Sequence, residues 1–251
     1  MGTFVRMGSM SAEILGIAGW DFIVIDMEHG VHSFADVLEI KRAAASVGVS
    51  TVVRIPDPTE ISVMRALDSG GEGVQIPQIR TLEEVKSVSA AARFAPLGTR
   101  GSCSYTSSAQ YAFTPYQEHI KTSNEEVLVV IHIENKETAY MIDEILEVPG
   151  IDVIFCGPWD MSQSLGIPGE TQHPLVKSTI KNVISKCKSK GIASGMFINR
   201  PEQINEWLEA GVTYFTYATD VGMYGEILRQ TLADTRKHIN LWEETEGENY
   251  G

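Results

Sequence analysis

Two carboxylates follow neighbouring apolar runs near the middle of the 251-residue chain. Residues 128–131 lead to Glu134, and residues 151–155 lead to Asp160. If the two runs are consecutive strands of a parallel sheet, both acids reach the same end of that sheet, within the span of one cation. Paired carboxylates suit a hard divalent cation that takes its remaining ligands from water and substrate. The spacing therefore predicts a metal site, and a buried ion-pair network with an arginine is the alternative.

Three more ionisable residues follow earlier apolar runs. Asp26 and His29 come after residues 22–25, and Arg54 ends the run 51–53. An acid beside an imidazole supplies an oriented general base, because the carboxylate fixes the tautomer; a helix N-cap is the structural alternative. A charged residue at the end of an apolar strand is costly unless it is paired. Arg54 is therefore either an anion clamp or the partner of an inward carboxylate.

Short apolar runs alternate with segments of helical period, and this pattern predicts one α/β domain. The expected strands are residues 3–6, 22–25, 51–54, 73–76, 127–133, 152–155, 192–197 and 214–217. A predicted helix follows each strand, and glycine or proline marks most of the returns to the next strand. The repeats favour a parallel barrel over residues 1–241, followed by an acidic tail at residues 242–251. A doubly wound sheet is the alternative, but no glycine-rich nucleotide turn follows the first strand.

In a parallel barrel the active site lies at the carboxyl ends of the strands, where the ionisable residues are expected to gather. One long connection, residues 94–126, interrupts the alternation. Long connections are usually functional, and we expect this one at the same barrel end as the carboxylates. No predicted strand ends in lysine, so Schiff-base chemistry has no evident nucleophile.

Composition narrows the choice of partners. The chain carries 20 Lys and Arg against 33 Asp and Glu, a formal net charge of −13. This balance argues against nucleic acid and anionic membrane surfaces as partners, and an anionic small-molecule substrate needs a local arginine. Neither a secretory signal nor an apolar run of membrane-spanning length is evident. The three cysteines lack paired spacing, so the expected location is the cytoplasm.

Several motifs occur in the order and spacing of a known family. They are GWDFIVIDMEH at 19–29, VVR at 52–54, GTRG at 98–101, Glu134, and GPWD at 157–160. Together they resemble the HpcH/HpaI class II aldolases over nearly the whole chain. The resemblance implies a (β/α)8 TIM barrel of the phosphoenolpyruvate/pyruvate type, assembled as a hexamer, a trimer of dimers that exchange their last helix. It also implies a lyase that cleaves a 4-hydroxy-2-oxo acid to pyruvate and an aldehyde through a metal-stabilised pyruvate enolate.

The resemblance further implies roles for the ionisable residues. Glu134 and Asp160 would hold the divalent metal, which is Mg²⁺, Mn²⁺ or Co²⁺. Arg54 would contact the keto oxygen of pyruvate. His29, with Asp26 behind it, would serve the proton transfer.

The resemblance also implies that the GPWD segment binds the substrate. The backbone amides of Trp159 and Asp160, next to Gly157, would receive the pyruvate carboxylate at the start of a helix. Phe197 is expected in the pocket wall. Three positions depart from the family: His132 stands where glutamine is usual, Trp159 stands where alanine is usual, and Thr3 or Phe4 stands where a tryptophan is usual near the amino terminus. His132 would replace the amide as a donor to pyruvate, add a third metal ligand, or change the working pH.

Two other function classes stay open. One is a related lyase that acts on a CoA thioester or decarboxylates an oxo-diacid, although no obvious basic nucleotide-binding patch supports CoA. The other is a catalytically silent barrel that serves in binding or assembly. A catalytically silent barrel is disfavoured by the joint presence of five ionisable residues, which are Asp26, His29, Arg54, Glu134 and Asp160.

Overall fold

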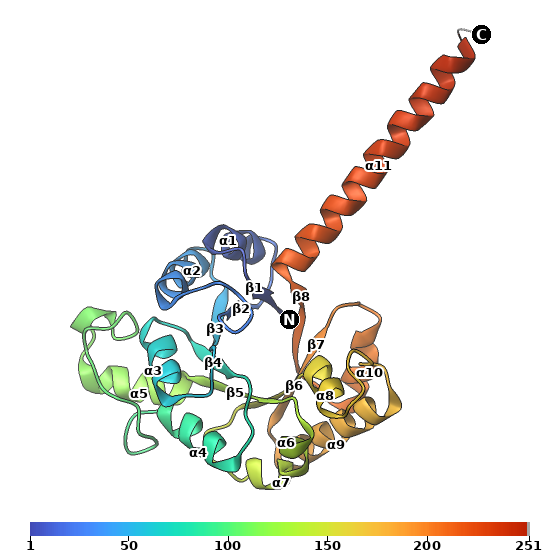
Figure 1. Ribbon diagram of the computed structural model, residues 1–251. Coiled ribbons are helices and arrows are strands. Elements are labelled where there is room, and N and C mark those ends of the chain that lie inside the picture. The colour runs from blue at the N-terminus through green and yellow to red at the C-terminus, as the bar shows by residue number, and fades with distance from the viewer. Residues whose placement is uncertain (250–251) are drawn as a thin grey trace.

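The computed structural model describes residues 1–249, and side chains as far as residue 240. Its strands are parallel and hydrogen-bonded in chain order, and β8 pairs with β1 to close a barrel (Figure 1). The strands are β1 (Gly2–Val5), β2 (Phe22–Asp26), β3 (Ser50–Arg54), β4 (Gly73–Ile76), β5 (Leu128–Ile133), β6 (Val153–Cys156), β7 (Ala193–Ile198) and β8 (Tyr214–Thr219). The predicted parallel (β/α)8 TIM barrel is confirmed.

Helices surround the barrel, and α11 leaves it as a long rod (Figure 1). The helices are α1 (Ser9–Ile17), α2 (Phe34–Ser46), α3 (Glu60–Asp68), α4 (Leu82–Ala91), α5 (Tyr116–Glu126), α6 (Lys136–Tyr140), α7 (Ile142–Ile145), α8 (Pro158–Ser164), α9 (Pro174–Lys190), α10 (Gln203–Ala210) and α11 (Asp220–Asn249), with a 3₁₀ turn η1 (Gln110–Ala112). The backbone of α11 crosses the expected domain boundary at residue 241, so the division into barrel and tail stays a prediction. Residues 250–251 of the expected tail lie outside the described residues.

Local sequence explains where several helices begin and end. Ser33 and Thr81 each form a capping box at the start of α2 and α4, which satisfies N–H groups that have no partner within the helix. Gly191 and Gly211 end α9 and α10 in the left-handed conformation, with φ of 71° and 109°. These glycines stand at helix-to-strand returns, as the turn chemistry predicts.

Side chains alternate between two apolar layers. One layer fills the barrel interior, and the other lies between the strands and the helices. The buried interior residues are Phe4, Val24, Val52, Val130, Val153 and Phe155. Because the period is two, the next inward position on β1, β2, β3 and β5 carries Arg6, Asp26, Arg54 and His132. The alternation therefore places polar side chains at the carboxyl end of the barrel.

The long connection 94–126 lies at the opposite end of the barrel from the carboxylates, so its expected position was wrong. It joins α4 to β5, and a helix-to-strand connection returns the chain to the amino ends of the strands. Within it the N–H of Ser108 donates to the carbonyl of Asp68, the last residue of α3. Arg100 of the GTRG motif pairs with the Asp68 carboxylate at 2.7 Å, far from the predicted metal site in chain and in space.

Candidate active site

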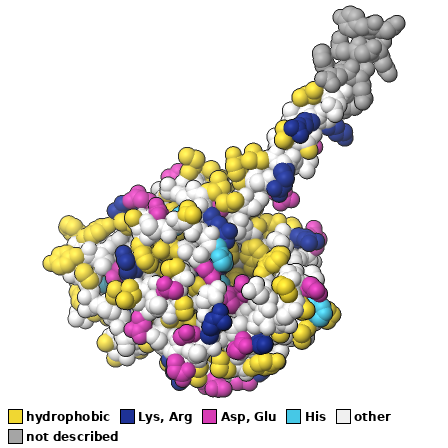
Figure 2. Space-filling view, viewed as in Figure 1, with side chains coloured by type: hydrophobic (Ala, Val, Ile, Leu, Met, Phe, Trp, Pro, Cys, Tyr) yellow, Lys and Arg dark blue, Asp and Glu magenta, His cyan; other side chains and the backbone are white. Residues whose placement is uncertain are grey.

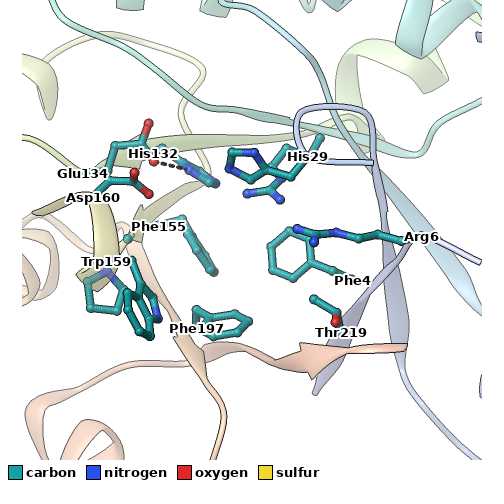
Figure 3. Close-up of a pocket in the computed structure, with 13 residues that line it drawn as sticks. Phe4, Arg6, His29, His132, Glu134, Phe155, Trp159, Asp160, Phe197 and Thr219 are labelled. Atoms are coloured by element: carbon teal, nitrogen blue, oxygen red, sulfur yellow. Dashed lines mark hydrogen bonds and ion pairs between the residues drawn. The ribbon is translucent and has the colours of Figure 1, made fainter. Parts of the chain in front are cut away.

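A cavity of about 280 Å³ opens at the carboxyl ends of the strands (Figure 3). Figure 2 shows acidic, basic and histidine side chains gathered near the middle of this face. The lining residues are Phe4, Arg6, His29, Arg54, His132, Glu134, Phe155, Gly157, Pro158, Trp159, Asp160, Phe197 and Thr219. The structure thus brings every predicted site residue to one cavity except Asp26, which lies fully buried behind Arg54.

The two predicted metal ligands lie side by side. Glu134 follows β5 and Asp160 lies in the first turn of α8, and Gly157 stands between them. A Cβ atom on Gly157 would sit 3.3 Å from Glu134 Oε2 and 3.9 Å from Asp160 Oδ2. The glycine therefore leaves open the space that both carboxylates face.

The two carboxylates differ in their partners. Glu134 Oε1 accepts the Gln78 N–H at 2.6 Å, and Oε2 lies 3.0 Å from His132 Nδ1. Burial would raise the pKa of Glu134, but His132 and the Gln78 N–H hold the pKa below its ordinary value. Burial raises the pKa of Asp160, and the charges of Glu134 and Glu28 raise it further. Asp160 is exposed to solvent and accepts no hydrogen bond from any described residue, so its carboxylate is open to a ligand.

This donor set fits a hard divalent cation. Two carboxylates of unequal pKa converge, and one has no donor within the described chain. The described residues hold no group of three or more His, Cys, Asp and Glu placed as metal ligands. Mg²⁺ and similar cations nonetheless bind through one or two carboxylates, with the remaining positions filled by water and substrate. The alternative of an ion pair between these two acids and Arg54 or Arg100 is not formed, because both arginines bind other carboxylates.

Arg54 is held by two acids and a ring. Its Nε and Nη2 donate to the two oxygens of Asp26, each at 2.8 Å, and its Nη1 lies 3.0 Å from Glu28 Oε2. The guanidinium carbon lies 4.4 Å from the centre of the Phe4 ring. Burial would raise the pKa of Asp26, but the arginines and backbone N–H groups lower it to about 2. Arg54 is thus a fixed, fully charged donor at the cavity wall.

His29 stands half-exposed at the rim of the cavity. Asp26 Oδ1 accepts its backbone N–H at 3.2 Å, and does not bond the ring. The carboxylate nearest the imidazole is Glu28, with Oε2 3.7 Å from His29 Nε2. Asp26 therefore orders the loop that carries His29, whereas Glu28 is the acid beside the ring. Glu28 could have been predicted as the acid beside the imidazole, because it stands between Asp26 and His29 in the sequence.

His132 belongs to a buried chain of hydrogen bonds. The Tyr214 hydroxyl donates to Gln75 Oε1 at 3.4 Å, which turns Gln75 Nε2 toward His132 Nε2 at 2.6 Å. The imidazole then accepts at Nε2 and carries its proton on Nδ1, facing Glu134. Its ring stacks on Phe155 with centroids 4.8 Å apart. His132 is therefore placed behind the predicted metal ligand and fixed in one tautomer.

Aromatic rings form the other side of the cavity. Phe4 contacts Phe155 and Phe197, with ring centroids 6.5 and 6.0 Å apart. Trp159 is 54% exposed at the mouth, where its ring approaches Gly169. The sequence prediction included Trp159 and Phe197 but did not assign Phe155 to the site. Phe155 could have been assigned to the site from the register of β6, because it occupies an inward position two residues before Gly157.

Comparison with known proteins agrees with this geometry. A profile described as HpcH/HpaI aldolase/citrate lyase matches residues 4–226. The chain belongs to this family. It is 31% identical over 224 residues to the 2-dehydro-3,6-dideoxy-6-sulfogluconate aldolase of Pseudomonas putida, covering 89% of this chain and 87% of that one. It is also 31% identical to the hydroxypyruvate/pyruvate aldolase of Roseobacter denitrificans, covering 86% and 84%.

Solved structures of HpcH/HpaI proteins share the fold. A family member from Burkholderia cenocepacia has a TM-score of 0.88 and 30% identity, over 94% of this chain and 93% of the other. Family membership confirms the predicted enzyme class, a class II aldolase and carbon–carbon lyase, and dependence on a divalent metal in general terms. Within the part of the chain that the structure describes, no helix is both long and apolar enough to cross a membrane.

Proposed function

We propose that this chain cleaves a 4-hydroxy-2-oxo acid to pyruvate and an aldehyde, with a divalent cation held by Glu134 and Asp160. The observation that carries the proposal is the convergence of these two acids in one cavity with Arg54 and His29. The cavity has a volume of about 280 Å³, which suits a small oxo acid. One relative is named a hydroxypyruvate/pyruvate aldolase, which agrees with a pyruvate product.

Different residues of the chain bind the keto oxygen and the carboxylate of the substrate. Arg54 is fixed by Asp26 and Glu28, and it presents a positive charge to the keto oxygen of the substrate. The first turn of α8 offers the N–H groups of Trp159 and Asp160, which have no acceptor within the helix, to the substrate carboxylate. A bound divalent cation supplies positive charge that polarises the keto oxygen and offsets the charge that develops on it.

His29 serves as the base in the cleavage direction. It removes the proton of the C4 hydroxyl, a C4–O double bond forms, and the C3–C4 bond breaks. The electron pair of that bond moves into the keto group and gives the enolate of pyruvate, whose oxygen faces Arg54. Proton return to C3 completes pyruvate, and the aldehyde leaves the cavity. Addition of pyruvate to an aldehyde is the same sequence reversed.

A panel of 4-hydroxy-2-oxo acids assayed for pyruvate release tests this proposal. Chelator-treated protein is expected to be inactive, and Mg²⁺, Mn²⁺ or Co²⁺ is expected to restore turnover. Glu134→Gln should lower kcat/KM at least about a hundredfold. Glu137→Gln, an exposed carboxylate three residues later, is the matched control. Full turnover after exhaustive chelation would refute the metal assignment.

Of the three cations, we propose Mg²⁺ as the resident one, because an all-oxygen donor set with room for water is what it prefers. The cytoplasm is the proposed location. The free thiols Cys103, Cys156 and Cys187 support a reducing compartment.

We also propose that the chain is a homo-oligomer in which α11 packs on a second copy. The described part of α11 carries large apolar side chains that are about half-exposed: Val221, Tyr224, Ile227, Leu228, Leu232 and Ile239. On α1, Ile14 and Ile17 are 60% and 77% exposed. Figure 2 shows hydrophobic side chains around the base of the projecting helix. Exposed apolar stripes of this kind mark interaction surfaces, and a trimer of dimers with exchanged last helices would cover them.

A further inference from the structure

Arg6 is a charged side chain of the cavity that the proposed reaction does not use. It follows β1 and points inward, because it lies two positions after the interior residue Phe4. In Figure 3 its guanidinium extends over the Phe4 ring toward the middle of the cavity. Glu134 and Asp160 lie on the opposite side of the same cavity (Figure 3). Arg6 is therefore a cation on the wall opposite the two predicted metal ligands, where it shares Asp26 Oδ2 with Arg54.

One carboxylate fixes the backbone of Arg6. Asp220, buried at the start of α11, accepts the N–H of Arg6 at 3.0 Å and the N–H of Met7 at 2.9 Å. It also accepts the Ser11 hydroxyl at 2.8 Å. Asp220 thus binds the main chain of this loop, and the Arg6 side chain remains directed into the cavity.

The Arg6 side chain is anchored by one edge only. Its Nε donates to Asp26 Oδ2 at 2.7 Å, which fixes the plane of the guanidinium. The terminal nitrogens Nη1 and Nη2 bond no described residue, and the side chain is 31% exposed to the cavity. Two parallel N–H groups on one guanidinium edge match the oxygens of a carboxylate, sulfonate or phosphate.

A hydroxyl-bearing side chain, Thr219, lines the same cavity as Arg6. Thr219 lines the cavity at the end of β8, below Arg6 in Figure 3. Its Oγ1 accepts the N–H of Gly222 at 2.9 Å, so the hydroxyl hydrogen remains to donate to a ligand. Phe4 and Phe197 lie between this pair and the carboxylates, and they offer apolar contact to the carbon atoms of a chain that crosses the cavity.

We propose that Arg6 and Thr219 form a subsite for an anionic group on the aldehyde half of the substrate. The inference rests on the proposed aldolase function. The reacting carbon lies at His29, the carbon chain passes Phe4 and Phe197, and the terminal anion binds the free edge of Arg6 and the Thr219 hydroxyl. The chain's net charge of −13 repels anions at long range, so a local arginine is what such a substrate needs.

Aldol addition of pyruvate to paired aldehydes tests the subsite. Succinic semialdehyde carries a terminal carboxylate, and pentanal is its neutral counterpart. Arg6→Gln is expected to lower the ratio of kcat/KM for the anionic over the neutral aldehyde by at least about tenfold, and Arg6→Lys by less. Arg42→Gln, on the outer face of α2, should leave the ratio unchanged. An unchanged ratio in Arg6→Gln would overturn the subsite. Sulfoacetaldehyde and glycolaldehyde phosphate then show which anion is preferred.

A binding measurement separates this inference from the proposed reaction. Succinic semialdehyde is titrated by calorimetry into protein that holds Mg²⁺ and oxalate, an unreactive mimic of the pyruvate enolate. Wild type is expected to bind it at least about tenfold more tightly than Arg6→Gln. Equal affinities, or no binding to wild type, would overturn the subsite. If wild type binds but adds pyruvate to none of the aldehydes, the proposed reaction fails and the anion subsite stands.

Discussion

His132 Nδ1 lies 3.0 Å from Oε2 of Glu134, with the imidazole oriented from behind by Gln75. A donor behind a metal-binding carboxylate fixes its rotamer, and its loss commonly lowers metal affinity by about 10–100-fold. His132→Leu should therefore weaken Mg²⁺ binding by about tenfold in calorimetry. His132→Asn places an amide N–H at the position of Nδ1 and should recover most of that loss. Equal affinities in the two variants would contradict a positioning role.

Asp160→Asn should separate metal binding from stability. Burial and the charges of Glu134 and Glu28 raise the pKa of Asp160, so the ionised carboxylate destabilises the metal-free protein near neutral pH. The amide removes this repulsion, and because solvent screens charges at this exposed position, we expect Asp160→Asn to be more stable than wild type in EDTA by less than about 1 kcal/mol. Mg²⁺ binding should be lost. Lower stability in EDTA would show instead that Asp160 has a structural role.

Asp26→Asn should remove an acid-dependent part of the stability. The folded pKa of Asp26 falls from 3.8 to about 2, so its stabilising contribution is full above pH 4 and is lost as the pH falls toward 2. The shift corresponds to roughly 2 kcal/mol, and loss of the partner of two arginines adds to it, for a total of about 2–5 kcal/mol. Urea unfolding between pH 2 and pH 6 measures both. Asp143→Asn, an exposed partner of Lys186, is the control; equal pH slopes for wild type and Asp26→Asn would contradict the expectation.

The apolar side of α11 predicts a dependence of assembly on Leu228. Leu228→Glu puts a charge where we expect contact with a second copy, and it should weaken association by at least about tenfold in sedimentation velocity. Gln230→Glu adds the same charge two residues later, on a polar position of the helix, and should leave the sedimentation coefficient unchanged. A wild-type sedimentation coefficient for Leu228→Glu would exclude this surface from the interface.

The sequence was sufficient to predict the barrel and most of the site. The apolar runs are short and most are bounded by glycine or proline, so the strand count follows from chemistry that acts over a few residues. Glu134, Asp160, Arg54 and His29 could be located because each immediately follows such a run, and all four line the cavity.

Other parts of the site depend on which face of each strand points inward and on which strands are neighbours. Arg6 and Gln75 lie within expected strands, at 3–6 and 73–76, yet a run of four residues does not reveal its inward face. The pairing of Asp26 with Arg54 is set by the register of β2 on β3, which places the two residues side by side. The position of residues 94–126 was wrong, because a long loop was assigned to the functional end without considering that it leads from a helix into a strand.

The carboxylate of Asp220 joins the beginning of the barrel to its end. Its partners at residues 6, 7 and 11 leave the ribosome early, whereas Asp220 follows only after β8. During synthesis, which proceeds at about 5–20 residues per second, the backbone N–H groups of the loop that carries Arg6 lack their Asp220 acceptor until more than 200 further residues have been added. The wall of the pocket that carries Arg6 is thus completed only when the chain that follows β8 binds the loop that follows β1.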